Sequence, residues 1–280
     1  MPSLPDTSPI VVASHPRSGT HLLIDLLRWQ FNACRSWKWW GERLDRLYCS
    51  IDELGASRGR LDESTAQTIL SRTDRPIVKT HAWPSLDEAF LQSHHDGLPN
   101  GWSSWLKQRG LLLYSVRDVR DVMASYQMFR DWFEDHPGDL GTFIRGSDAL
   151  ELPNRVANWT HHVRAWQEAP YCHVIRFEDL LQDTEAQIQR LSELLGLDPD
   201  WKTPLLPERF SSIWDSRWAR LFSSQPESTA IIGTGSQDWE TELTSDDCAF
   251  IHQEAGDVLI DLGYVSSDSW VSERTQWNAS

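Results

Sequence analysis

Long apolar runs are missing from the 280-residue sequence, and this absence bears on where the protein resides. A membrane-spanning helix needs about 20 consecutive apolar residues, whereas runs such as the three leucines at 111–113 fall far short. The amino-terminal residues also show no basic stretch followed by an apolar one, the pattern of a secretory leader. We therefore expect a soluble, cytoplasmic protein without a transmembrane segment.

Cysteines are few and acidic residues outnumber basic ones, which argues against a zinc-binding, disulfide-rich or nucleic-acid-binding protein. The four cysteines are irregularly spaced and form no CxxC pair, which argues against a zinc site or a disulfide framework. The adjacent histidines His94/His95 and His161/His162 are interpreted as surface residues, so no metal is expected. With 26 basic and 41 acidic residues, the net charge is −15, which disfavours a nucleic-acid partner. An anionic ligand would need a local pocket of positive charge.

Hydrophobic periodicity predicts strands that alternate with helices. Short β-rich runs predict strands at 9–14, ending near Lys79, at 111–116 and at 171–177. Helical spacing predicts helices at 21–31, 118–129, 154–168 and 244–262, and another that Asp183 or Thr184 caps and Gly196 ends. This order is typical of an α/β fold with three layers, α/β/α, around a central parallel sheet. We expect a single domain over residues 1–280, with loop insertions around 35–75, 83–108 and 129–153.

A P-loop-like phosphate-binding loop is predicted where the first strand meets the first helix, in VVASHPRSGTHLL at 11–23. Compared with the pattern GxxxxGK[ST], Thr20 takes the place of the lysine, and His21 that of the hydroxyl residue that binds Mg²⁺. Unpaired backbone N–H groups at 18–21 and the dipole of the next helix would attract an anion, and Arg17 adds a full charge. The loop suits a phosphate ligand but lacks two groups that ATP chemistry requires.

Two further elements place polar residues at the ends of predicted strands. Arg117 follows the strand at 111–116, and Ser125 lies two turns into the next helix. Lys79 and His81, two residues apart at the end of another strand, are expected to project to one side. Ligands of parallel sheets bind at the carboxyl ends of the strands. A base and a cation are therefore expected near the phosphate-binding loop.

Taken together, PRSGTH, VKTH, RDVRDVMASY, RFEDL and GTGSQDW resemble, in order and spacing, the family of sulfotransferases that use PAPS (3′-phosphoadenosine 5′-phosphosulfate), from about Ile10 to Tyr264. The resemblance implies PAPS as co-substrate, PAP as product and no metal. It implies that the 5′-phosphosulfate is held by Arg17, Ser18, Gly19, Thr20 and His21, and the 3′-phosphate by Arg117 and Ser125. His81 would be the general base, and Lys79 and Arg17 would stabilise the leaving phosphate.

Some positions depart from the family pattern. Arg17 stands where lysine is usual, and residues 231–233 read Ile-Ile-Gly where an Arg-Lys-Gly run usually clamps the nucleotide. The 3′-phosphate would then also depend on backbone N–H groups at 233–236, which makes Gly233 and Gly235 candidate binding residues. Phe177 replaces a tyrosine, so adenine recognition carries over only in part.

Plainer interpretations of two features remain open. Arg117 could simply form an ion pair with Asp118 or Asp121 at the start of the next helix. The WKWW segment at 37–40, the densest cluster among 16 tryptophans, is interpreted as packing residues in preference to a platform for the acceptor.

The acceptor is expected to be a small molecule or a glycolipid-like alcohol, because the aromatic content of the predicted loops favours a hydrophobic or sugar-bearing alcohol over a highly charged glycan. Two alternatives to a sulfotransferase remain. A P-loop kinase of a small metabolite would need the missing lysine and a magnesium-binding carboxylate. A nucleotide-binding module that has lost catalysis would explain the missing Arg-Lys-Gly run, although Lys79 and His81 argue against it.

Overall fold

The computed structural model describes most of the chain, at residues 4, 6–39, 42, 44–54, 61–84, 91–92, 98–131, 138–148, 152–207 and 239–272. The chain divides into two compact units. The first comprises Met1–Ser14, Gly19–Val116 and Trp166–Thr234, and the second comprises His15–Ser18, Arg117–Ala165 and Gly235–Ser280. The expectation of a single domain over residues 1–280 stays a prediction.

A five-stranded sheet forms the centre of the first unit, in the order β2-β3-β1-β6-β7. Its strands are β1 (Ile10–Ser14), β2 (Cys49–Ser50), β3 (Ile77–Thr80), β6 (Leu111–Val116) and β7 (Cys172–Arg176). All four pairings are parallel, which confirms the predicted sheet. Every residue of β1 is buried, as a central strand covered on both faces requires. Because the strands run in one direction, their carboxyl ends share one edge.

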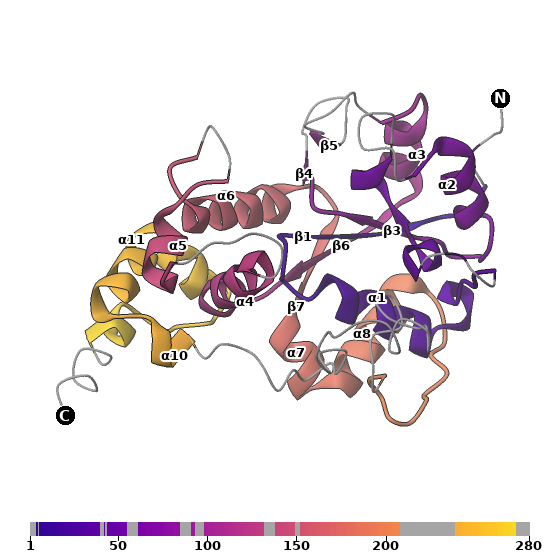
Figure 1. Ribbon diagram of the computed structural model, residues 1–280. Helices are drawn as coiled ribbons and strands as arrows, with labels where there is room; N and C mark the ends of the chain where they lie inside the picture. The colour runs from indigo at the N-terminus through magenta and orange to yellow at the C-terminus, as the bar shows by residue number, and fades with distance from the viewer. Residues whose placement is uncertain are drawn as a thin grey trace, which may run out of the picture. The chain divides into compact units, whose positions relative to one another are not determined.

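Helices cover both faces of this sheet, so the predicted three-layer fold is confirmed. Figure 1 shows one face covered by α1 (Thr20–Gln30), α7 (Phe177–Gln182) and α8 (Thr184–Leu195), and the other by α2 (Glu63–Leu70) and α3 (Trp102–Arg109). On the first face, Ile10 and Val12 belong to one apolar cluster with the leucines of α1 and with Ile188 of α8. On the opposite face, Trp166 stacks on Tyr114 with ring centroids 5.8 Å apart.

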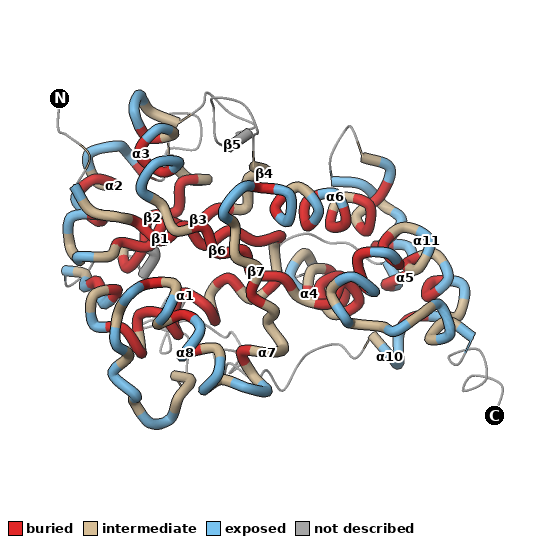
Figure 2. Tube along the Cα trace, turned by 180° about the vertical axis from the view of Figure 1, so that it is seen from behind, coloured by how far each residue is buried: buried red, intermediate tan, exposed pale blue. Residues whose placement is uncertain are grey.

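The burial of these side chains is the main source of the first unit's stability. Figure 2 shows β1, β3 and β6 buried along most of their length, while the outer faces of the helices are exposed. Each fully buried side chain of the size of valine or leucine stabilises the fold by about 1.5–3 kcal/mol. The carboxyl ends of the strands are therefore held by a rigid support.

Shorter elements connect the strands and helices of the first unit. They are η1 (Asn32–Cys34), η2 (Leu44–Leu47), η3 (Ile51–Glu53) and an antiparallel pair, β4 (Trp83–Pro84) with β5 (Leu91–Gln92). The predicted cap of α8 is confirmed at Asp183, whose side chain accepts a hydrogen bond from the Ala186 N–H. Gly196, with a φ of 64°, ends this helix in the left-handed conformation, as predicted.

The second unit is helical in its described part. Its helices are α4 (Val119–Asp131), α5 (Leu140–Arg145), α6 (Arg155–Glu168, of which the residues up to 165 belong here), α10 (Trp239–Glu242) and α11 (Ser245–Asp261). Arg120 of α4 binds Asp118 at 2.5 Å and lies over the rings of Trp239 and Trp270, which fixes α10 and the residues after α11 against α4. The predicted helices at 118–129, 154–168 and 244–262 are confirmed to within two residues. None of the described helices is long and apolar enough to cross a bilayer.

Candidate active site

The loop between β1 and α1 has an unusual backbone. Arg17 has a φ of 67° and Gly19 a φ of 87°, both in the left-handed region that residues with a side chain seldom adopt. A Cβ atom on Gly19 would lie 2.4 Å from Cδ2 of Phe177, closer than any real contact. Both the backbone conformation and the ring of Phe177 therefore require glycine at position 19.

The amino end of α1 points its backbone N–H groups out of the loop, but fewer of them than predicted. The N–H of Ser18 donates to the carbonyl oxygen of His15 at 3.2 Å, so the prediction of an unpaired N–H at Ser18 is wrong. The N-cap is Gly19, which has no side chain to accept from the first turn, and that turn holds no acidic residue. The amino end of α1 therefore carries a partial positive charge that favours an anion.

His81 lies directly after β3 and is held by the last residue of β1. Its Nδ1 lies 2.7 Å from the carbonyl oxygen of Ser14 and 3.3 Å from the Ser14 hydroxyl. Because a carbonyl oxygen only accepts hydrogen bonds, Nδ1 carries a proton, and when the ring is neutral its lone pair lies on Nε2. The Ser14 hydroxyl shares a 2.5 Å hydrogen bond with that of Thr20, so one residue joins the start of α1 to His81.

Lys79 precedes His81 by two residues and is partly buried within β3. Burial lowers the pKa of Lys79 below its ordinary value, and the negative charges of Asp52 and Glu53 oppose that shift. Side chains two residues apart along an extended chain lie on one side of it, so the shared orientation of Lys79 and His81 stays a prediction. The first unit thus brings together Ser14, Thr20, Lys79 and His81 at the carboxyl ends of β1 and β3.

Asp52, in η3, belongs to this cluster and was not found by sequence reasoning. Its carboxylate accepts a hydrogen bond from the Thr80 hydroxyl at 2.6 Å and one from the His81 N–H at 2.8 Å. The contact follows from the pairing of β2 with β3, which places Ser50 beside Lys79. A strand of two residues is too short to show a hydrophobic pattern. Residues 35–75 were therefore predicted as a loop insertion, and neither β2 nor the contact of Asp52 was expected.

In the second unit, the predicted phosphate-binding residues Arg17 and Ser125 are in contact. Nε of Arg17 donates to the Ser125 hydroxyl at 3.1 Å, and the guanidinium lies 5.0 Å from the ring centre of Phe129. Burial and, second, the positive charge of Arg117 lower the pKa of Arg17. Two cations held in a partly buried place favour the binding of an anion there.

The plainer interpretation of Arg117, an ion pair with Asp118 or Asp121, is confirmed for Asp121. Arg117 forms an ion pair with Asp121 at 3.7 Å, whereas Asp118 binds Arg120 instead. An ion pair of this length contributes little to stability. A phosphate that approached Arg117 with two oxygens would compete with it well.

Two other predicted features fall differently. Gly233, Gly235 and the pair His94/His95 lie outside the described residues. The interpretation of His162 as a surface residue is wrong, because it is 1% exposed and its ring meets that of His15 edge to face at 5.7 Å. Among the described residues, no group of three or more histidine, cysteine, aspartate or glutamate side chains is arranged to hold a metal ion.

The tryptophans at the start of the WKWW segment are not packing residues, contrary to our interpretation. Trp37 is 47% and Trp39 64% exposed, and their rings meet edge to face at 5.0 Å. The guanidinium of Arg72 lies 4.9 Å from the ring centre of Trp37, and Arg72 precedes the amino end of β3. His81 follows the carboxyl end of that strand, so Trp37 lies near the opposite edge of the sheet and is not an acceptor platform beside His81.

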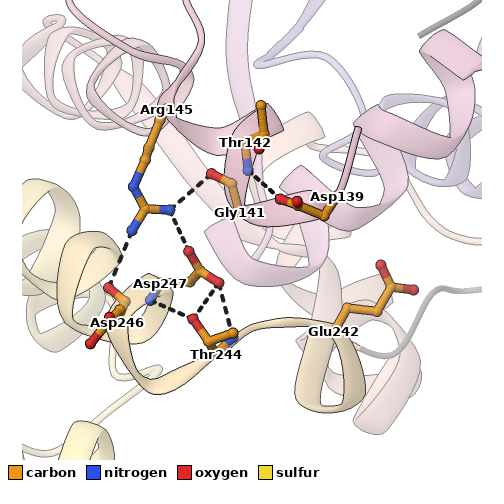
Figure 3. Close-up of a pocket in the computed structure, with 8 residues that line it drawn as sticks. All are labelled: Asp139, Gly141, Thr142, Arg145, Glu242, Thr244, Asp246 and Asp247. Atoms are coloured by element: carbon orange, nitrogen blue, oxygen red, sulfur yellow. Dashed lines mark hydrogen bonds and ion pairs between the residues drawn. The ribbon is translucent and has the colours of Figure 1, made fainter. Parts of the chain in front are cut away.

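A cavity of 480 Å³ in the second unit has the wrong charge for a nucleotide. Figure 3 shows it between α5 and the start of α11, lined by Asp139, Gly141, Thr142, Arg145, Glu242, Thr244, Asp246 and Asp247. Its one cation, Arg145, already binds Asp247 and the carbonyl oxygen of Gly141. The four carboxylates would repel a phosphate, so this cavity is not the predicted binding site.

Comparisons with known proteins agree with these features. A family model described as the sulfotransferase domain matches residues 7–252. The curated sulfotransferase 2A2 of Rattus norvegicus is 31% identical over 206 residues, which cover 68% of this chain and 61% of that relative. The chain spans about three fifths of the length of the curated relatives that it matches.

Solved structures share the fold at low identity. Retinol dehydratase in a complex with retinol and PAP gives a TM-score of 0.55 at 18% identity, over 93% of this chain and 83% of that one. Mouse sulfotransferase SULT7A1 complexed with PAP gives a TM-score of 0.52 at 15% identity, over 96% of this chain and 90% of that one. At such identities the likeness concerns the arrangement of the backbone.

Proposed function

The chain belongs to the sulfotransferase family, and from this premise we propose that it transfers a sulfuryl group from PAPS to the hydroxyl group of an acceptor. The observation that carries the proposal is the 2.7 Å hydrogen bond between His81 Nδ1 and the Ser14 carbonyl oxygen. In the neutral ring this bond places the lone pair on Nε2, which would then be the proton acceptor that a general base provides. PAPS supplies an activated sulfuryl group on its 5′-phosphate.

His81 removes the proton of the acceptor hydroxyl while the acceptor oxygen bonds to sulfur. Lys79 and Arg17 stabilise the charge that develops on the 5′-phosphate oxygen as its bond to sulfur breaks, and PAP is released. The burial that lowers the pKa of Lys79 also strengthens its interaction with that charge. No step needs a divalent metal ion, because lysine and arginine neutralise the leaving group.

The nucleotide is held by two sets of residues. Arg17, Ser18, Gly19, Thr20 and His21 bind the 5′-phosphosulfate, with the N–H groups from Gly19 onward directed at it. Arg117 and Ser125 bind the 3′-phosphate. In support of this, the positive charge of Arg117 lowers the pKa of Arg17, which is in contact with Ser125, so two cations are gathered beside the proposed site. Gly233 and Gly235 remain proposed contributors to the 3′-phosphate site.

The proposed acceptor is a small hydrophobic or glycolipid-like alcohol, and the proposed location is the cytoplasm. The relative solved with retinol carries a small apolar alcohol of this class, which supports but does not fix the choice. The rival function of a metabolite kinase meets a specific difficulty, because Thr20 and not lysine stands in the loop, and the Thr20 hydroxyl is engaged with Ser14.

Replacing His81 with alanine tests the proposed base. Turnover of labelled PAPS with a panel of phenols, steroid alcohols and lipid extracts should fall by roughly 10²- to 10⁴-fold, as the loss of a general base predicts. The affinity for PAP, measured by calorimetry, should stay nearly unchanged, because His81 is not among the proposed nucleotide ligands.

His161→Ala is the matched control, since His161 is an exposed histidine of α6 in the second unit. It should leave both turnover and PAP affinity at parental values. Turnover by His81→Ala at the parental rate would rule out His81 as the base. Absence of any sulfated product from the parent, despite PAP binding, would favour a binding module.

A further inference from the structure

The pairing of β3 with β2 ends at Lys79, before the chain reaches His81. β2 is a strand of two residues at the edge of the sheet, and its pairing with β3 ends with Ser50 beside Lys79. The chain then turns into η3 and cannot offer further carbonyl oxygens in register. A backbone N–H that is left without an acceptor in a partly buried place costs stability and precision.

The carboxylate of Asp52 supplies the missing acceptor. Its Oδ2 accepts from the His81 N–H at 2.8 Å and its Oδ1 from the Thr80 hydroxyl at 2.6 Å. The oxygen of that hydroxyl accepts in turn from the Ala82 N–H at 2.9 Å. Thr80 is fully buried, so its hydroxyl has few alternative partners. One carboxylate therefore fixes three consecutive residues, with His81 in the middle.

The ring of His81 is fixed from the other side. Its Nδ1 donates to the Ser14 carbonyl oxygen in β1, at a distance that tolerates little displacement of the His81 backbone. If the backbone at residue 81 moved, Nδ1 would lose this acceptor, and the proton could reside on either nitrogen. The hydrogen bond that the His81 N–H donates to Asp52 and the one that its ring donates to Ser14 thus depend on each other.

We propose that Asp52 is a positioning residue for the reaction: by holding the backbone of Thr80 and His81, it keeps the His81 ring bonded to Ser14 and so keeps Nε2 free of a proton. This inference rests on the proposed function of His81 as the base. The carboxylate of Asp52 contacts the backbone N–H of His81, and Asp52 affects the reaction only by holding His81 in place.

Glu53 provides a matched control within the same turn. Asp52 and Glu53 both act on Lys79 through their charge, so the loss of either carboxylate changes the electrostatics of Lys79 in the same direction. The carboxylate that accepts the hydrogen bonds of Thr80 and His81 is that of Asp52. Comparing Asp52→Ala with Glu53→Gln therefore separates positioning from charge.

The experiment has a readout that does not depend on turnover. In protein labelled with ¹⁵N-histidine, the ring nitrogens of His81, identified by their disappearance in His81→Ala, report which nitrogen carries the proton. The parent and Glu53→Gln should show a single neutral form with the proton on Nδ1. Asp52→Ala should show a mixture of the two neutral forms, and its kcat should fall by roughly 10- to 100-fold, the cost of a small misplacement of a catalytic group, with KM for PAPS unchanged.

Asp52→Asn guards against a misfolded alanine variant, because its amide oxygen can still accept from the His81 N–H. It should keep mostly the parental form of the ring and a smaller loss of kcat. An unchanged ring form and unchanged kcat in folded Asp52→Ala would overturn the proposal, as would an equal loss in Glu53→Gln. If the parent itself transferred no sulfuryl group, the proposed function would fail, and the ring signals alone would decide whether Asp52 positions His81.

Discussion

Arg17 and Arg117 show how a chain of net charge −15 can still gather positive charge in one place. Burial and the neighbouring charge of Arg117 lower the pKa of Arg17, which means that Arg17 is held where its charge is costly. Nε of Arg17 donates a hydrogen bond to the Ser125 hydroxyl, and Arg117 forms an ion pair with Asp121 at 3.7 Å. A bound phosphate would offset the repulsion between the two guanidinium groups. The local arrangement of charge, more than the total, decides which ligand can bind.

Replacing Arg117 with alanine should weaken PAP more than AMP. The loss of a charge-assisted contact to the 3′-phosphate predicts about 1.5–3 kcal/mol, which calorimetry would detect as a fall in PAP affinity of roughly ten- to a hundredfold. AMP has no 3′-phosphate, so its affinity should change little. Arg164→Ala, which removes an equal charge from an exposed arginine that pairs with Asp257, should leave both affinities unchanged. An equal loss for AMP and PAP would show that Arg117 does not read the 3′-phosphate.

At the scale of elements, the turn from β1 into α1 depends on glycine. Gly19→Ala places a Cβ against Phe177 and forces a side-chain residue to a φ of 87°, so we expect a loss of about 1–3 kcal/mol in the free energy of unfolding. Urea unfolding measures this loss. Gly138→Ala is the control, because no atom lies within 4 Å of the added Cβ. Equal stability of the two variants would mean that the loop relaxes around the new side chain.

Elements with a strong local signal were predictable. The buried β-branched run of β1, the leucine run of β6 and the cap and terminal glycine of α8 each carry their information within a few residues. β2 could not be predicted, because two residues make no period and its existence depends on pairing with β3. Asp52 was missed for the same reason.

The candidate site was predictable in its side chains but not in their backbone partners. Lys79, His81 and Arg17 were predicted from residue type and spacing and remain proposed site residues, whereas the Ser14 carbonyl oxygen that fixes the His81 ring carries no residue signature. Burial of His162 and exposure of Trp37 depend on tertiary packing, and composition pointed the wrong way for both. Sequence reasoning therefore located the chemistry before it could describe its geometry.

At the scale of the whole molecule, acidic residues leave few places where a nucleotide could bind. The cavity of 480 Å³ in the second unit is lined by four carboxylates and would exclude one. The arginines of the second unit and the amino end of α1 in the first carry the positive potential instead. The match of the sulfotransferase domain to residues 7–252 includes both sets of residues.

Calorimetry with PAP and with ATP tests the central claim most directly, namely that the chain binds a nucleotide with phosphates at both the 3′ and the 5′ positions without a metal ion. We predict a clear binding signal for PAP in the presence of EDTA, a weaker one for AMP, and little for ATP whether or not Mg²⁺ is added. No heat with PAP, together with strong Mg²⁺-dependent binding of ATP, would contradict the account.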